Sequence, residues 1–172
     1  MGPQNILFPD PDIISPLAIM FARMMFAHAQ FEQEVRILQG AITNDRTFGE
    51  QRRNQWGAKE RPKKMAKLIK AHLGTIPEAR EIAKILTDAK PYCERRDFLA
   101  HGIWWRYSQK TSTITVRGGS SKKGPPHMKD YTETDIAMIV GWFKAFSAEL
   151  YKLRAAIEHR RGDHDVDEHG RA

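Results

Sequence analysis

The chain has 172 residues, of which 41% are hydrophobic, so it is long enough and apolar enough to bury one core. Lysine and arginine outnumber aspartate and glutamate by 28 to 21, and the net charge of +7 suits a nucleic-acid partner, although it is equally typical of basic proteins that have none. The single cysteine, Cys93, excludes an intrachain disulfide and favours a reducing, cytoplasmic location.

Both ends of the chain differ in composition from its middle. Residues 1–12 hold three prolines and are predicted to form an extended lead-in. Residues 13–29 are apolar, but acidic residues precede them and Arg23 interrupts them, so we expect neither a signal peptide nor a membrane span. Residues 13–160 are predicted to form one domain, and the polar residues 161–172 a disordered tail. The histidines of this end match no zinc-site pattern, so we expect no metal and no other cofactor.

A long first helix is predicted from Ser15 to Ile42. Its apolar residues recur at alternating spacings of three and four, which places them on one stripe. Met20, Met25 and Phe26 widen the apolar surface beyond that stripe, so we expect the helix to contact a second subunit as well as its own core. His28 lies on the main stripe and is more typical of a packed core histidine than of a catalytic one.

The segment that follows is the most basic part of the chain. Residues 43–57 are predicted to form a turn-rich connection, and residues 57–73 an amphipathic helix that Gly74 ends. These two stretches supply the following candidates for RNA phosphate contacts: Arg52, Arg53, Lys63, Lys64 and Lys67. An ordinary solvated helix face has the same composition, so both interpretations stay open.

A third helix is predicted to begin near Pro77 and to end in a charged run. The run reads Arg96-Asp97-Phe98-Leu99-Ala100-His101-Gly102. Pro91 lacks an N–H group, so we expect it to kink this helix or to start a new one. Gly102 directly follows the last helical turn and is predicted to be its left-handed cap.

Arg96 continues the apolar stripe of the third helix. Its guanidinium must therefore be paired or face a cleft, because an unpaired buried charge is very costly. Two interpretations stay open. Arg96 forms a structural ion pair with a glutamate such as Glu34 or Glu94, or it binds a phosphate group, for which its planar donor fork is suited.

His101 is the second candidate catalytic group, because an imidazole exchanges its proton near neutral pH. Asp97 lies four residues earlier on the same face, so we expect it to accept a hydrogen bond from His101 and to orient the ring. The alternative is a plain C-terminal cap that neutralises the helix end. Within one helix, Arg96 and His101 point about 140° apart. The two groups converge on one phosphate more easily when two copies of the run meet.

The hydrophobic period changes after Gly102. Residues 103–107 and 111–117 are rich in β-branched and aromatic residues and predict a short antiparallel hairpin. Trp104 and Trp105 are candidate stacking surfaces for RNA bases, although such residues more often cover the end of a core. Residues 118–129 are predicted to be a flexible loop. The last helix is predicted to begin with a capping box at Thr132 and Asp135 and to run to about residue 160.

The run from Arg96 to His101 resembles the R-x4-6-H motif of the HEPN superfamily, and the pair Glu94-Arg95 before it and Gly102-x-Trp104 after it belong to the same likeness. The resemblance implies an all-α, HEPN-type bundle of about four to five helices with a small β-hairpin insertion before the last helix. It also implies a homodimer with a shared site.

The activity that the resemblance implies is that of a metal-independent endoribonuclease of the toxin–antitoxin or phage-defence type. The RNA 2′-hydroxyl attacks the adjacent phosphate, His101 transfers the proton, Arg96 binds the phosphate and Asp97 orients His101. RNA, a second copy of the chain and an antitoxin protein are the expected partners, and no membrane is. The alternative is a non-catalytic HEPN-like module that binds a partner protein, a nucleotide or RNA.

Overall fold

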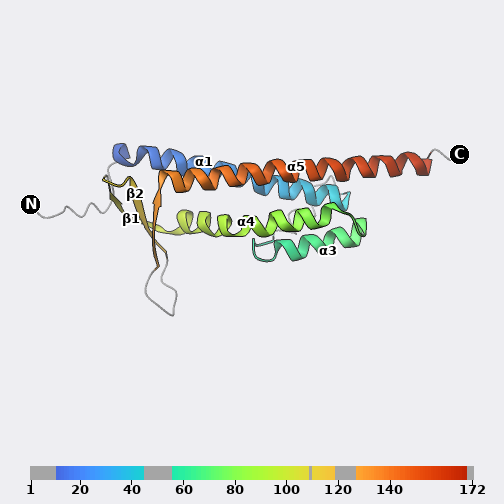
Figure 1. Cartoon of the computed structure of the whole chain (residues 1–172), viewed down its shortest axis with the longest axis horizontal. Helices are drawn as coiled ribbons and strands as arrows, with labels where there is room; N and C mark the ends of the chain where they lie inside the picture. The colour runs from blue at the N-terminus through green and yellow to red at the C-terminus, as the bar shows by residue number, and fades with distance from the viewer. Residues whose placement is uncertain (1–10, 45–55, 109, 119–126, 170–172) are drawn as a thin grey trace, which may run out of the picture. The chain divides into compact units, whose positions relative to one another are not determined.

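A computed structural model describes residues 11–44, 56–108, 110–118 and 127–169; for residues 11–15 and 163–169 it describes the backbone alone. The elements in chain order are helices and one group of strands (Figure 1): α1 (Pro11–Thr43), α3 (Arg61–Leu73), α4 (Glu78–His101), β1 (Ile103–Ser108), β2 (Thr113–Arg117), β3 (Met128–Thr132) and α5 (Glu133–His169). The predicted mainly helical fold with strands before the last helix is confirmed. None of the described helices has an apolar stretch long enough to cross a membrane.

The chain divides into two compact units. Unit 1 comprises Met1–His28 and Pro91–Trp142, and unit 2 comprises Ala29–Lys90 and Phe143–Ala172. Each boundary therefore falls inside one of the three long helices. The single domain expected over residues 13–160 stays a prediction. Of the lead-in expected over residues 1–12, only Pro11 and Asp12 are described, and they begin α1.

The core of unit 1 is built from the apolar stripes of three helices and one face of the sheet. The 3.6-residue helical period and the two-residue strand period bring these side chains to the inside. On the edge of this core, the rings of Phe21 and Trp104 meet at 86° with their centroids 5.2 Å apart. The fully or almost fully buried members include Leu17, Met24, Leu99, Ile114, Val116, Ile136 and Ile139.

The sheet is antiparallel, with strand order β1-β2-β3. The predicted hairpin between residues 103–107 and 111–117 is confirmed as β1 and β2. The third strand is a correction, because residues 128 and 129 were expected in a loop. Only Tyr131 of β3 is buried, and the sequence of the strand shows no alternation of apolar and polar residues. The pairing of β3 with β2 therefore determines the extended conformation of β3.

Gly102 has a different role from the one predicted. Gly74 follows the last residue of α3 and ends that helix, as expected. Among the described glycines only Gly74 has a positive φ, of 68°, so the prediction of a left-handed cap at Gly102 is wrong. A Cβ atom at Gly102 would collide with the Val116 side chain and would lie 2.6 Å from the Phe98 carbonyl oxygen. Glycine is needed there because the end of α4 approaches β2 closely.

The capping box at the start of α5 is confirmed. The Thr132 N–H donates to the Asp135 carboxylate at 2.9 Å, and the Asp135 N–H donates to the Thr132 hydroxyl at 3.1 Å. The hydrogen bond from the Thr132 backbone lowers the pKa of Asp135, and the bond from the Thr132 hydroxyl acts in the same direction. The carboxylate is thereby fixed as an acceptor at the first turn of the helix.

Two long helices continue past the points where the sequence predicted an interruption. The segment assigned to α4 runs through Pro91, so no new helix starts there. The backbone of α5 continues to His169, where a disordered tail from residue 161 was expected. Residues added to an existing helix each gain a hydrogen bond without repeating the cost of nucleation, so a polar sequence can extend it.

In unit 2 the amphipathic helix α3 buries Met65 and Ile69. From α1 and α5, the ring of Phe31 lies 5.6 Å from that of Phe143 and 6.2 Å from that of Phe146. Ile82 and Leu86 of α4 are also buried. The apolar edge predicted for residues 57–73 is thus a core-facing stripe.

We expect Gly102→Ala to destabilise the protein by about 1–3 kcal/mol, because the added methyl group overpacks the contact between α4 and β2. Gly141→Ala is the matched control. Gly141 lies within α5, a Cβ atom there would have open space within 4 Å, and alanine should add up to about 1 kcal/mol of stability through its better helix propensity. Urea denaturation of the two variants measures both effects. Equal stability of Gly102→Ala and the wild type would contradict the close approach.

Candidate functional site

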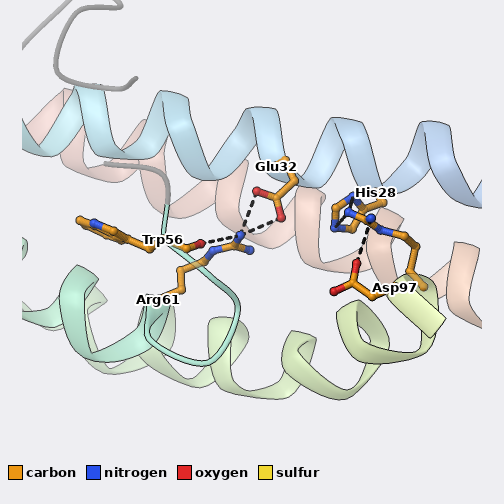
Figure 2. A network of polar contacts seen from close by, with 6 residues as sticks. His28, Glu32, Trp56, Arg61 and Asp97 are labelled. Carbon is orange, nitrogen blue, oxygen red and sulfur yellow. Dashed lines mark hydrogen bonds and ion pairs between the residues drawn. The ribbon is translucent and has the colours of Figure 1, made fainter. Parts of the chain in front are cut away.

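Arg96 is held by two side chains of unit 1. Its Nη2 atom lies 2.8 Å from Nδ1 and 3.0 Å from Nε2 of His28, which comes from α1. Its Nη1 atom lies 2.9 Å from a carboxylate oxygen of Asp97. Figure 2 shows the His28 and Asp97 side chains with the dashed contacts that join them to this guanidinium. The Arg96 side chain is only 18% exposed. Its guanidinium is paired by these contacts, as its position on an apolar stripe requires.

The hydrogen bond between Arg96 and His28 depends on the tautomer of the imidazole. An arginine N–H group only donates, so the ring must present an unprotonated nitrogen as acceptor. A neutral imidazole has one such nitrogen, so only one of the two short distances is a hydrogen bond in any given tautomer. His28 is 6% exposed, and its ring is therefore fixed by the core around it.

One donor of Arg96 is left over. Its Nε atom is buried and has no hydrogen-bond partner among the described residues. Glu34, one of the two carboxylates considered as a partner, lies instead 3.7 Å from the Arg154 guanidinium in unit 2. The guanidinium of Arg96 thus has a firm contact on one side, to His28, and a half-exposed one on the other, to Asp97.

His101 faces solvent at the last residue of α4. Within the described part of the chain its side chain makes no hydrogen bond or ion pair, and the Asp97 carboxylate contacts Arg96 rather than His101. A single chain therefore does not bring the three candidate catalytic residues together. Arg96 turns inward and His101 outward, as their spacing on the helix requires.

The two tryptophans that follow have separate roles. The Trp104 indole N–H donates to the Leu99 carbonyl oxygen at 3.0 Å, and its ring packs on Phe21. Trp105 is 45% exposed, and the Arg117 guanidinium lies 5.5 Å from its ring centroid. Trp104 therefore packs at the edge of the core of unit 1, and Trp105 is the more exposed of the two.

The candidate phosphate-binding lysines lie on α3 in unit 2. Lys63, Lys64 and Lys67 are exposed, and Lys64 pairs with Glu60 at 2.7 Å. The hydrogen bond and the positive charge of Lys64 lower the pKa of Glu60. Arg52 and Arg53 lie outside the described residues.

Arg61 belongs to the same basic segment, but it is a core residue. It is 6% exposed, and its Nη2 atom donates to both carboxylate oxygens of Glu32 at 2.8 and 2.9 Å and to the Trp56 carbonyl oxygen at 3.2 Å (Figure 2). Its guanidinium also lies 5.7 Å from the centroid of the Phe31 ring. A basic segment read from the sequence thus contains both surface charges and a charge that the fold needs.

The sequence contains a signal for the partner of Arg96. The apolar stripe of the first helix contains one histidine, His28, and the apolar stripe of the third helix contains one arginine, Arg96. Polar groups placed on two core-facing stripes need partners, and each can satisfy the other. The structure brings these two together.

We compared the chain with models of known families, with curated proteins and with solved structures, and none of the three comparisons gave a match. The likeness to the HEPN superfamily therefore rests on the run around Arg96 and His101. Function is argued below from these residues and their geometry.

We expect His28→Leu to destabilise the protein by roughly 1–3 kcal/mol, because it leaves a guanidinium donor of Arg96 without its acceptor in the core. His28→Gln keeps an acceptor and should lose less. The double variant His28→Leu with Arg96→Met should be more stable than the sum of the single changes predicts, since both ends of the contact are then apolar. Denaturant unfolding of the wild type, of the single variants His28→Leu and Arg96→Met, and of the double variant measures this coupling. Strict additivity would contradict the contact.

Proposed function

We propose that the chain is a metal-independent endoribonuclease of the toxin–antitoxin or defence type, built on a HEPN-type bundle. The observation that carries the proposal is that one helix end combines an arginine with a fixed guanidinium, Arg96, and an exposed histidine with no partner in the described chain, His101. A cation for the phosphate and a group that exchanges protons are the two requirements for RNA cleavage without a metal.

In the proposed reaction the 2′-oxygen of the RNA attacks the adjacent phosphorus, and the bond from phosphorus to the 5′-oxygen breaks. His101 takes the proton of the 2′-hydroxyl, and the departing 5′-oxygen takes a proton from water, so the products are a 2′,3′-cyclic phosphate and a 5′-hydroxyl. Arg96 binds the phosphate oxygens, where negative charge builds up in the transition state.

The contacts of Arg96 suggest how the phosphate reaches it. Asp97 is 56% exposed, and an ion pair of this kind contributes little to stability. An incoming phosphate can therefore replace the Asp97 carboxylate at Nη1 while His28 still holds Nη2. Asp97 then acts as a stand-in for the phosphate in the absence of RNA, which differs from the role in orienting His101 that the sequence suggested.

The proposal includes a homodimer, because Arg96 and His101 diverge within one chain. Seven large apolar side chains of unit 1 are exposed among the described residues, four of them on the helices α1 and α5, and exposed apolar patches mark contact surfaces. Ile19 and Phe26 are seven residues apart on α1 and are 51% and 66% exposed; Met138 and Trp142 are four apart on α5 and are each 43% exposed. A second copy that covers them would bring a second Arg96 and His101 to the site. An antitoxin protein is the other partner that such a surface would suit.

One observation favours the alternative of a non-catalytic binding module. Arg96 already has two partners, as a structural arginine would, and Asp97 does not orient His101. In that case the same helix end would bind RNA, a nucleotide or a protein without chemistry. Cleavage assays separate the two functions.

We expect Arg96→Ala and His101→Ala each to lower RNA cleavage by at least about 100-fold, because each removes a group that acts in the transition state. EDTA should leave wild-type cleavage unchanged. Mixing the two inactive variants should restore part of the activity, since a dimer formed from both has one Arg96 and one His101. His159→Ala is the matched control, because it removes an exposed histidine of α5 in unit 2.

Cleaved RNA is measured on gels. A 5′-hydroxyl end is identified by its labelling with a polynucleotide kinase, and a 2′,3′-cyclic phosphate end by its resistance to ligation. Cleavage that requires magnesium would contradict the mechanism. The absence of any cleavage by the wild type would favour the binding module. Lack of recovery on mixing, with both single variants inactive and dimeric, would contradict the shared site.

We expect charge removal at Lys63, Lys64 and Lys67 to weaken RNA binding equally for different sequences, because phosphate contacts carry no sequence information. The salt dependence of binding should flatten by about one unit of log–log slope for each phosphate group that the variant no longer neutralises. A triple change at Lys84, Lys90 and Lys152 removes the same charge elsewhere and is the control. Equal affinity and slope in the two triple variants would assign the α3 lysines to a solvated face.

A further inference from the structure

We propose that the outer face of the three-stranded sheet in unit 1 binds the bases of single-stranded RNA, with Trp105 and Arg117 as the stacking residues. This inference deepens the proposed ribonuclease function and rests on it for the choice of RNA over DNA. The sequence suggested both tryptophans as candidates. The structure separates them and adds the other residues of the surface.

The strand register defines which side chains share this face. Residues paired across antiparallel strands point to the same side, and Ile103 pairs with Arg117, which pairs with Met128. Ile103 is 62% exposed and Met128 is 52% exposed, so this row faces solvent. The adjacent row contains the buried Val116 and faces the core.

A β-bulge brings two further side chains to the outer face. The register shifts between Trp104 and Arg106, so β1 has one extra residue there. Trp104 pairs with the buried Val116 and points inward. Arg106 pairs with Thr115, which lies between the buried Ile114 and Val116 on β2 and therefore points outward, so Arg106 points outward too. Trp105 and Arg106 are therefore exposed next to each other, where a regular strand would turn one of them inward.

The chemistry of the face matches unpaired bases. The Arg117 guanidinium lies 5.5 Å from the Trp105 ring centroid, so a flat cation and a flat aromatic ring lie together at the surface. Bases stack on both kinds of group, and arginine also neutralises phosphate. Asp130 is the acidic residue of this face; it accepts a hydrogen bond from the Thr115 hydroxyl at 2.6 Å and offsets one of the two arginine charges.

The face is continuous along the chain with the proposed catalytic residue. Gly102 directly follows His101, and its close approach to Val116 fixes the end of α4 on β2. Ile103, the first residue of the outer row, follows His101 by two residues in the chain. Only a single strand fits this face, because the bases of a duplex are stacked on one another and their flat faces are not available.

Charge argues for a nucleic acid over a second copy of the chain at this face. An interface between two copies at this face would bring together Arg106 and Arg117 of both chains with one Asp130 from each, and such an excess of like charge disfavours an interface. A polyanion meets the same residues with the opposite charge. The chain as a whole carries a net charge of +7, which adds to this attraction.

The test measures binding separately from cleavage. Fluorescence anisotropy with a labelled single-stranded RNA 12-mer, its duplex and the DNA of the same sequence is recorded for the full-length His101→Ala protein. We expect Trp105→Ala in this background to weaken binding of the single strand by about tenfold or more, the effect of losing one stacked base. Arg117→Gln should weaken it too, and duplex binding should change little in both.

Tyr151→Ala is the matched control, because Tyr151 is also an exposed aromatic residue with an arginine, Arg154, 4.8 Å from its ring centroid, but it lies in unit 2. It should leave RNA binding unchanged. Trp105→Phe keeps an aromatic ring and should restore most of the affinity, which separates stacking from folding if Trp105→Ala is unstable.

The outcomes distinguish this inference from the proposed function. Unchanged affinity in Trp105→Ala overturns the stacking face, even if the wild type cleaves RNA. Weakened single-strand binding with no cleavage by the wild type supports the face and overturns the ribonuclease. Equal losses of affinity for the single strand and the duplex also overturn the stacking of bases on this face and indicate recognition of RNA shape. A change of oligomeric state with RNA affinity intact overturns it too and indicates that the face binds a second copy of the chain.

Discussion

A guanidinium cannot be buried without a partner, and this constraint shapes both units of the chain. In unit 2, Arg61 donates to both oxygens of Glu32 and lies over the Phe31 ring, so α3 is joined to α1 by an ion pair and a cation–π contact. In unit 1, Arg96 donates to His28 of α1 and to Asp97 of its own helix. Removing the partner leaves buried guanidinium donors without an acceptor, which makes each pair specific for its arrangement of helices.

The partner of Arg96 also determines what that residue can do. A carboxylate in the place of His28 would neutralise the guanidinium and compete with a phosphate for it. A neutral imidazole holds the side chain in position and leaves its positive charge in place. The side chain is thereby ordered before any ligand arrives, and less conformational entropy is lost on binding. The same arrangement satisfies the fold and presents a cation, so the structural and the functional interpretations of Arg96 share one geometry.

The sequence predicted those features that depend on local patterns. The long first and last helices follow from apolar residues at spacings of three and four, and the capping box follows from Thr132 and Asp135. The features it did not predict depend on contacts between distant segments. Gly102 resembles a helix cap until Val116 is placed against it. Arg61 resembles its surface neighbours until Glu32 is placed beside it, and β3 has no strand pattern of its own because β2 provides its partner.

The candidate site shows the same division within one short segment. The helical period between residues 96 and 101 turns Arg96 inward and His101 outward, and this much follows from the sequence. The strand period would then place Trp104 and Trp105 on opposite faces, but it does not say which of them is inside. The contact of Gly102 with β2 sets the phase of β1 at the point where the helix ends, and the bulge after Trp104 resets it for Arg106. Two backbone features therefore determine which side chains of β1 are exposed to a ligand: the glycine at position 102, which has no room for a side chain, and the extra residue in the edge strand β1. Neither feature takes part in the proposed chemistry itself.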